Sequence, residues 1–223
     1  DTIPNEISIT AKDKNVLIIG GGDTGSDCLG TSLRQGAKNV YQFELLPEPP
    51  RERNDSNPWP QWPKVFRVSS SHVEANERAG KDKITEYCVS TKKFSGKDGK
   101  VTKIHGVKIE FGDPDPQTGR PQMLEVPESE FELEVELVLL AMGFVHPIHE
   151  GMLAELAMDL DARGNVVCDD NKMTSVDGIF VAGDMTRGQS LVVWAIAEGR
   201  EAARSVDLHL MGETQLPHSQ FLK

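Results

Sequence analysis

Residues 16–28 read VLIIGGGDTGSDC, an apolar run that ends in three glycines, with Gly25 completing the spacing G-x-G-x-x-G. Leu29 and Leu33 then recur at helical spacing, which predicts a helix directly after the glycines. In such a turn Gly20 permits the tight bend, Gly22 lets the backbone approach a pyrophosphate, and Gly25 lets helix and strand pack closely. The helix N-terminus adds free N–H groups and partial positive charge. The stretch predicts a dinucleotide-binding turn made by Gly20, Gly21, Gly22, Asp23, Thr24 and Gly25.

Glu44 is the second part of this prediction. Residues 39–45 (NVYQFEL) read as a second strand, and Glu44 lies near its end, 24 positions after Gly20. A carboxylate there can accept hydrogen bonds from both ribose hydroxyls of NAD, whereas a 2′-phosphate would meet like charge. Two unit charges 4 Å apart repel by about 4 kcal/mol at an effective dielectric of 20. The sequence therefore favours NADH, although an ordinary solvated glutamate, or a 2′-phosphate held by Arg51 or Arg53, remains an alternative.

Composition excludes several classes of function. The chain has 35 acidic residues against 24 Lys and Arg, a net charge of -11, which argues against nucleic-acid partners. Its three cysteines, Cys28, Cys88 and Cys168, form no C-x-x-C, so a redox dithiol, an iron–sulfur cluster and a metal site are not expected. No apolar run is long enough for a membrane span and no signal-peptide pattern opens the chain. We expect a protein of the cytosol or of an organelle matrix, such as that of a plastid, that is not secreted.

The middle of the chain is predicted to mix a loop, a helix and strands. Residues 46–63 are dense in proline, which forbids helix and central strand, and Trp59 and Trp62 are expected to pack this loop down or line a cleft. Residues 65–79 should be partly helical. Three stretches then predict a small antiparallel meander. Residues 134–144 (EVELVLLAMGF) predict a continuous buried parallel strand that ends at Ala141-Met142-Gly143. The stretches of the meander are 84–94, 101–111 and 123–126.

The last third contains a second candidate site. We expect a helical turn at 152–157, strands at 164–168 and 178–184, and a long helix over 188–211. Asp184 then lies at the carboxyl end of a strand, where ligands of open α/β sheets bind, just before a helix N-terminus. A turn with Asp184 as helix cap is the simpler alternative. The apolar positions expected to bury the long helix are Leu191, Val192, Ala195, Ile196, Ala203 and Val206.

Five motifs occur along the chain in this order: GGGDTGSDC, ELLPEPPRER, NPWPQWP, LLAMGF and AGDMTRGQSLVVWAIAEGREAA. Together they resemble the β-chain (small-subunit-like) flavoprotein portion of the NADH-dependent glutamate synthases. The resemblance covers nearly the whole chain except its ends and the meander. It implies an α/β fold of the type with two dinucleotide-binding domains, in which a Rossmann-like NAD(H) domain, here residues 1–143, is inserted into an FAD domain, here the C-terminal part at 144–223.

The resemblance also assigns cofactor roles. It implies that the turn at 20–25 and Glu44 bind NAD(H), and that the small-residue turn at Gly143 belongs to the same cofactor sites. Gly183 and Asp184 would hold the ribityl and phosphate side of FAD, and Gly188, Gln189, Ser190 and Leu191 would face its ring. In the family, hydride passes from NADH to FAD and electrons continue through iron–sulfur clusters toward glutamate synthesis from glutamine and 2-oxoglutarate. Such a transfer needs ring stacking and orientation, so no catalytic residue is expected, and each histidine is interpreted as a loop or packing residue.

The chain departs from the family pattern in ways that limit the prediction. It has one G-x-G-x-x-G, whereas family members carry a further FAD loop upstream, so the FAD site is expected to be half present. Cluster cysteines and the glutaminase and synthase parts are also missing. We expect a fragment whose partners are the rest of the same polypeptide or subunit. The alternatives are a related pyridine-nucleotide flavin oxidoreductase, of the pyrimidine dehydrogenase or ferredoxin-NADP reductase type, and a truncated fragment that binds nucleotide without catalysis.

Overall fold

The computed structural model describes residues 9–59, 63–81, 83–119 and 121–219, which form two compact units, Asp1–Met142 and Gly143–Lys223. The first unit contains a four-stranded parallel sheet in the order β3-β2-β1-β8 and an antiparallel sheet in which β5 pairs with β4, β6 and β7. The elements of this unit are β1 (Asn15–Ile19), α1 (Asp23–Arg34), β2 (Asn39–Glu44), α2 (Ser70–Ala79), β3 (Thr85–Tyr87), β4 (Val89–Lys97), β5 (Lys100–Pro114), β6 (Pro121–Glu125), β7 (Phe131–Glu134) and β8 (Leu137–Leu140).

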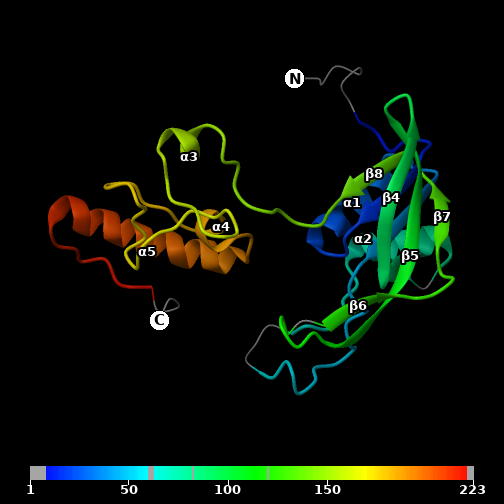
Figure 1. Cartoon of the computed structure of the whole chain (residues 1–223), viewed down its shortest axis with the longest axis horizontal. Coiled ribbons are helices and arrows are strands. Elements are labelled where there is room, and N and C mark those ends of the chain that lie inside the picture. The colour runs from blue at the N-terminus through cyan, green and yellow to red at the C-terminus, as the bar shows by residue number, and fades with distance from the viewer. Residues whose placement is uncertain (1–8, 60–62, 82, 120, 220–223) are drawn as a thin grey trace. The chain divides into compact units, whose positions relative to one another are not determined.

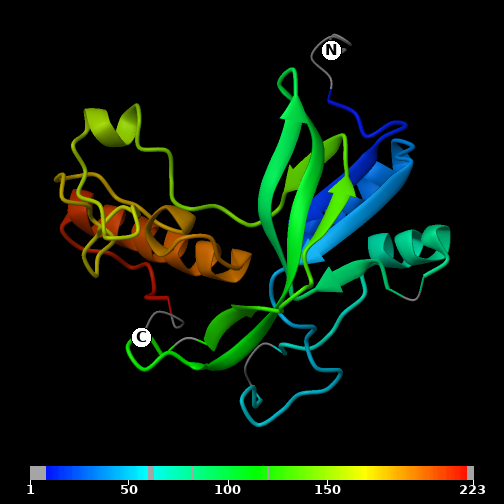
Figure 2. The ribbon, with the colours of Figure 1, turned by 45° about the vertical axis from the view of Figure 1, so that its right-hand side comes forward.

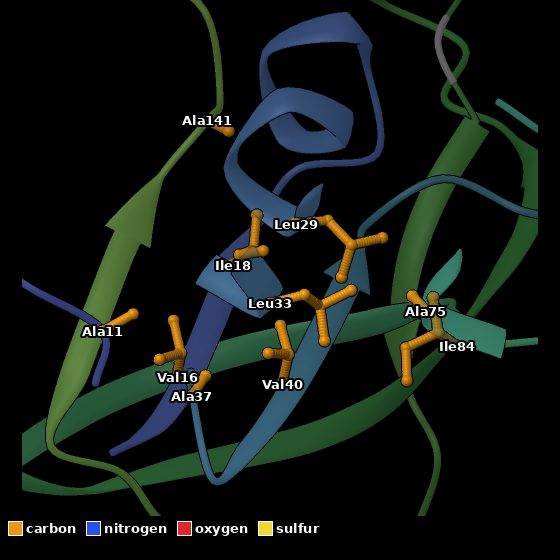
Figure 3. Packing of buried hydrophobic residues seen from close by; sticks show 10 residues of the cluster. All are labelled: Ala11, Val16, Ile18, Leu29, Leu33, Ala37, Val40, Ala75, Ile84 and Ala141. Carbon is orange, nitrogen blue, oxygen red and sulfur yellow. The ribbon is translucent and has the colours of Figure 1, made fainter. Parts of the chain in front are cut away.

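The alternation of side chains along β1 explains why its residues 16–19 are all apolar. Val16 and Ile18 pack with Leu29 and Leu33 of α1 on one face of the parallel sheet (Figure 3). Leu17 points to the opposite face, where it packs with residues of the antiparallel sheet such as Ile104. Each fully buried aliphatic side chain of this kind contributes about 1.5–3 kcal/mol. The expected Rossmann-like α/β arrangement of a parallel sheet with an antiparallel sheet is therefore confirmed.

The first unit has three layers as a result. Helices α1 and α2 cover one face of the parallel sheet, and the long β4–β5 hairpin runs along the other (Figures 1 and 2). Phe43 of β2 meets Phe131 of β7 edge to face, with ring centroids 5.7 Å apart, which ties the two sheets together. Because β1 is flanked by β2 and β8, the carboxyl ends of these three strands define the edge at which such sheets bind ligands.

Two strand predictions in the first unit were wrong in their boundaries. The expected strand at 84–94 is split at Cys88, whose φ of 56° turns the chain so that β3 joins the parallel sheet and β4 the antiparallel one. The expected continuous strand at 134–144 is reduced to β8, Leu137–Leu140, which pairs with β1, while Glu134 is the last residue of β7, which pairs with β5. β8 lies at the sheet edge, and Leu140 and Phe144 are exposed.

The proline-rich loop also differs from expectation. Trp59 is 82% exposed, so it neither packs the loop down nor lines a cleft. Its indole lies 5.9 Å from the guanidinium of Arg53. Trp62 lies outside the described residues. The helix expected within 65–79 is α2, which begins after Ser69, whose hydroxyl caps it by accepting a hydrogen bond from the His72 N–H.

The second unit contains α3 (Met152–Glu155), α4 (Asp184–Arg187) and α5 (Val192–Met211). The strands expected at 164–168 and 178–184 are reduced to isolated bridges, such as Met173 with Phe180. The long helix begins at Val192 rather than Gly188, because the preceding residues form α4 and an extended turn. Its predicted apolar face was also wrong: Leu191, Val192 and Ile196 are exposed, and the buried residues of α5 are Ala197, Glu198, Glu201 and Ser205.

Candidate functional site

The glycine turn lies at the carboxyl end of β1, between the ends of β2 and β8. The N–H of Gly20 donates to the Phe43 carbonyl of β2 at 2.8 Å, and the Ala141 N–H donates to the Ile19 carbonyl at 2.8 Å. Gly20 has a φ of 122°, a conformation that side chains oppose, and a Cβ there would overlap the Ala141 carbonyl. The turn is therefore fixed on both sides by the sheet.

The three glycines of the motif have different surroundings. A Cβ on Gly25 would overlap the Gly20 carbonyl and lie 2.9 Å from Nε2 of Gln42, so this position must stay small for α1 to pack on β1. Gly22, by contrast, caps α1 and has nothing within 4 Å of an added Cβ. Together with the exposed Asp23 and Thr24 it leaves the start of α1 open. This open cradle at a helix N-terminus fits a pyrophosphate.

Glu44 is fixed beside the turn by backbone hydrogen bonds. Its Oε2 accepts from the Gly21 N–H at 2.6 Å, and its Oε1 accepts from the Leu46 N–H at 2.9 Å. An added Cβ on Gly21 would lie 2.6 Å from Glu44 Oε2, so the absence of a side chain there allows the contact. The structure thus brings the predicted carboxylate and the predicted turn together, and each carboxylate oxygen keeps further lone pairs for a ribose hydroxyl.

The basic residues near Glu44 are already engaged. Arg51 pairs with Glu48 at 3.1 Å and stacks on Phe66, and Lys83 also pairs with Glu48. These partners hold the pKa of Glu48 below its ordinary value, mainly through the hydrogen bond from Lys83. Tyr87 of β3 is paired with Glu44 in the parallel sheet. The pKa of Tyr87 is raised mainly by burial and further by the negative charges of Glu48 and Glu44. Arg53 donates to the Asn57 carbonyl at 3.2 Å. Both arginines considered for a 2′-phosphate therefore have partners within the protein.

A buried polar network behind the turn was missed by the sequence analysis. Gln42, fully buried in β2, donates from Nε2 to the Gly20 carbonyl at 3.0 Å. Its Oε1 lies 2.6 Å from the Thr85 hydroxyl and 2.9 Å from Nε2 of His72. His72 was interpreted as a loop or packing residue, and it lies in α2 with a pKa lowered by burial. The signal that could have found this network is a glutamine inside an otherwise apolar strand.

The second candidate site is organised by a residue that the sequence analysis also missed. Glu198 of α5 is 2% exposed, and its Oε2 accepts from the Gly183 N–H at 2.8 Å. Its Oε1 accepts from Nε of Arg187 at 2.8 Å and from NH2 of Arg187 at 2.6 Å. Asp184 is exposed at the start of α4. The carboxylate of Glu198 therefore holds both ends of the turn that carries Asp184.

Two further predicted site residues are neighbours in the second unit. The Gln189 side chain accepts from the Phe144 N–H at 3.1 Å, and an added Cβ on Gly143 would overlap the Gln189 amide. Ser190 and Leu191 are exposed, whereas Gly188 is buried. Gly143 and the 188–191 turn, more than 40 positions apart in the chain, thus meet.

The three cysteines form no disulfide within the described ranges. Cys28, Cys88 and Cys168 are free and half-buried, and burial raises the pKa of the Cys28 and Cys168 thiols. Among the described residues no group of three or more His, Cys, Asp or Glu side chains is placed to hold a metal ion. Within the same ranges no helix is both long and apolar enough to cross a lipid bilayer.

The fold is that of a known family. The pyridine nucleotide-disulphide oxidoreductase model matches residues 4–199, and the chain belongs to this family. A thioredoxin reductase from T. acidophilum has the same fold, with a TM-score of 0.53 and 24% identity, covering 90% of this chain and 53% of that one.

The relatives in sequence are more specific. The chain is 51% identical to the glutamate synthase [NADPH] small chain of Mycobacterium tuberculosis H37Rv over 209 residues, which is 94% of this chain and 40% of that protein. It is 50% identical to the glutamate synthase [NADH] of Schizosaccharomyces pombe over 211 residues, which is 94% of this chain and 10% of that protein. The resemblance to glutamate synthases inferred from the motifs is confirmed. The chain spans less than half the length of these relatives.

Proposed function

We propose that the first unit binds NADH and that the chain is the segment of a glutamate synthase flavoprotein that passes hydride from NADH to FAD. The observation that carries the proposal is the Glu44 carboxylate, held by the Gly21 N–H at 2.6 Å beside the open N-terminus of α1. The turn at 20–25 would hold the pyrophosphate, and Glu44 would accept from the ribose hydroxyls. Electrons delivered in this way would serve glutamate formation from glutamine and 2-oxoglutarate in the cytosol or an organelle matrix, such as that of a plastid.

The preference for NADH rests on Glu44 rather than on the relatives. One relative is named for NADPH and another for NADH, at 51% and 50% identity, so similarity alone does not choose between the cofactors. A 2′-phosphate beside Glu44 would meet a fixed negative charge, and the arginines that could neutralise it, Arg51 and Arg53, already bond to Glu48 and Asn57. The local charge therefore supports NADH.

The second unit would supply part of an FAD site. We assign residues 1–143 to the NAD(H) domain and 144–223 to the C-terminal part of an FAD domain. The exposed Asp184 and the 188–191 turn offer hydrogen-bonding groups that suit a ribityl chain and a flavin ring. FAD, when bound, supplies the isoalloxazine ring that accepts hydride. Leu191, Val192 and Ile196 remain exposed at 53%, 71% and 58%, as expected if the other half of the domain covers them.

The remaining partners follow from the lengths of the relatives. Because the chain spans 40% of one relative and 10% of another, we propose that it acts with further parts of the same polypeptide or subunit. These parts would carry the first FAD half, the iron–sulfur domain and the glutaminase and synthase portions. Nucleic acid is not a proposed partner, because the net charge is -11.

Exchanging Glu44 for arginine is expected to reverse the nucleotide preference. The change removes the repulsion of a 2′-phosphate and adds a donor fork that suits it, while the ribose diol of NADH loses its acceptor. We expect the ratio of NADH to NADPH affinity to fall by at least about 10-fold, or 1.4 kcal/mol. Calorimetric titration of the 223-residue chain with each nucleotide measures this ratio.

Glu44→Gln is the matched control for this exchange. It keeps the side-chain length and one acceptor while removing the charge, and we expect it to narrow the preference without reversing it. If Glu44→Arg binds both nucleotides with the wild-type ratio, Glu44 is an ordinary solvated strand-end residue and the proposal is wrong.

A further inference from the structure

Both ends of one peptide group in the glycine turn are held by the same strand. The carbonyl of Gly20 accepts from Gln42 Nε2 at 3.0 Å, and the N–H of Gly21 donates to Glu44 Oε2 at 2.6 Å. Gln42 and Glu44 are two residues apart on β2, so their side chains leave the strand on the same face. A peptide group is planar, so fixing its carbonyl direction also fixes its N–H direction. The amide of Gln42 and the aim of the Glu44 carboxylate are thus coupled through this peptide group.

The amide of Gln42 can take only one orientation. The Gly20 carbonyl is an acceptor, so the Gln42 amide must present its NH2 group there and its oxygen to the other side. That oxygen accepts from the Thr85 hydroxyl at 2.6 Å and from His72 Nε2 at 2.9 Å. Nδ1 of His72 then accepts from the Ser69 hydroxyl at 2.7 Å, in agreement with a neutral ring, since burial lowers the pKa of His72.

The network also reaches the first turn of α1. The Ser69 hydroxyl lies 2.6 Å from that of Ser26, which follows the last glycine of the motif. Gly25 leaves the space that the Gln42 amide needs, because a Cβ there would lie 2.9 Å from Nε2. Gln42 is completely buried, so its amide can reach no solvent partner in place of the Gly20 carbonyl. Contacts from β3, α2 and α1 therefore fix one amide, and that amide fixes the turn.

We propose that Gln42 is a positioning residue for nucleotide specificity: by holding the Gly20 carbonyl it aims the Gly21 N–H at Glu44 and fixes that carboxylate for the ribose. It does not contact the nucleotide itself. This inference rests on the proposed binding of NADH at Glu44. The turn then has two separate functions: the pyrophosphate cradle at Gly22 serves NADH and NADPH alike, whereas the Glu44 carboxylate distinguishes the 2′-hydroxyl of NADH from the 2′-phosphate of NADPH.

The test compares two nucleotides on the full chain with changes at Gln42. Gln42→Met has similar length but no donor. Gln42→Asn keeps an amide but is one methylene shorter, so that its NH2 group no longer reaches the Gly20 carbonyl, and it supplies the more conservative replacement. We expect the ratio of NADH to NADPH affinity to fall about 5- to 10-fold in both variants, the effect of losing about one ordinary hydrogen bond. The Gly21 amide proton resonance should also move upfield as its bond to Glu44 lengthens.

Ile104→Val is the structural control. It removes a buried methyl group on the opposite face of the parallel sheet, outside the Gln42 network, so stability should fall by about 1 kcal/mol while the affinity ratio and the Gly21 resonance stay near wild type. An unchanged ratio in either folded Gln42 variant, or an equal loss of both nucleotides, would show a purely structural role and overturn the inference. Glu44→Gln distinguishes failure of the Gln42 inference from failure of the proposed NADH binding. If Glu44→Gln also leaves the ratio of NADH to NADPH affinity unchanged, the proposed NADH function fails as well. If Glu44→Gln changes this ratio and the Gln42 variants do not, only the role of Gln42 fails.

Discussion

Replacing Gly22 with valine is expected to lower the affinity for NADH about 100-fold and leave the fold intact. Gly22 has a φ of -78°, which valine adopts readily, and an added Cβ meets nothing within 4 Å. The same open space is where the pyrophosphate would approach the start of α1. Losing two charge-assisted hydrogen bonds at about 1.5 kcal/mol each lowers the affinity about 100-fold. Isothermal titration with NADH measures the loss, and circular dichroism shows whether the fold remains.

Other glycines of the chain make matched controls for this exchange. Gly199, in α5 of the second unit, also has nothing within 4 Å of an added Cβ, so Gly199→Ala should fold and bind NADH as the wild type does. Gly25→Val should instead damage the fold, because a side chain there would overlap the Gly20 carbonyl. Wild-type NADH affinity in a folded Gly22→Val protein would exclude this turn as the pyrophosphate site.

Glu198→Ala is expected to destabilise the second unit by about 2–3 kcal/mol, since it removes the acceptor of the buried Gly183 N–H and the partner of the part-exposed Arg187 guanidinium. Glu198 is 2% exposed and serves the Gly183 N–H and the Arg187 guanidinium at the same time. The variant loses the acceptor of a buried N–H as well as the ion pair. Because Arg187 keeps some contact with water, we expect a smaller loss than for a fully buried ion pair. Urea unfolding measures the change in stability, and circular dichroism follows it well because the long helix α5 contributes strongly to the helical signal.

Two further variants serve as comparisons for the stability of Glu198→Ala. Glu198→Gln keeps an acceptor for Gly183 and should lose less stability than alanine. Glu213→Ala removes an exposed acid just after α5 and should change the unfolding free energy by less than about 0.5 kcal/mol. If Glu198→Ala unfolds at the wild-type urea concentration, the carboxylate does not hold the Asp184 turn as the geometry indicates.

The first site was predictable from sequence because its constraints are local. The turn at 20–25 needs glycines where backbone approaches backbone, and the structure has Gly20 and Gly25 in contact. Glu44 was found because strand length and motif spacing place a residue at the end of β2. Gln42 was not singled out, because its function depends on Thr85 and His72, which approach it only after the chain has folded.

The second unit was predicted less well for a physical reason. The stretch at 178–184 was expected to be a buried strand, but only Phe180 of that stretch forms a bridge, and the described residues of the second unit include no strand that could complete a sheet with it. The apolar residues near the start of α5 were expected to be buried, yet Val192 is 71% exposed. Apolar pattern shows which residues favour burial, and it does not show whether the covering surface is in the same chain.

Anaerobic reduction of the flavin by NADH tests the central claim most directly. The measurement uses this chain joined to the proposed upstream FAD portion, and follows the visible flavin absorbance after NADH or NADPH is added. We predict that NADH bleaches the flavin at least about 10-fold faster than NADPH, the ratio set by the charge of Glu44. The 223-residue chain alone should purify without flavin. Equal rates with both nucleotides, no bleaching by NADH, or a full complement of flavin on the isolated chain would contradict the account.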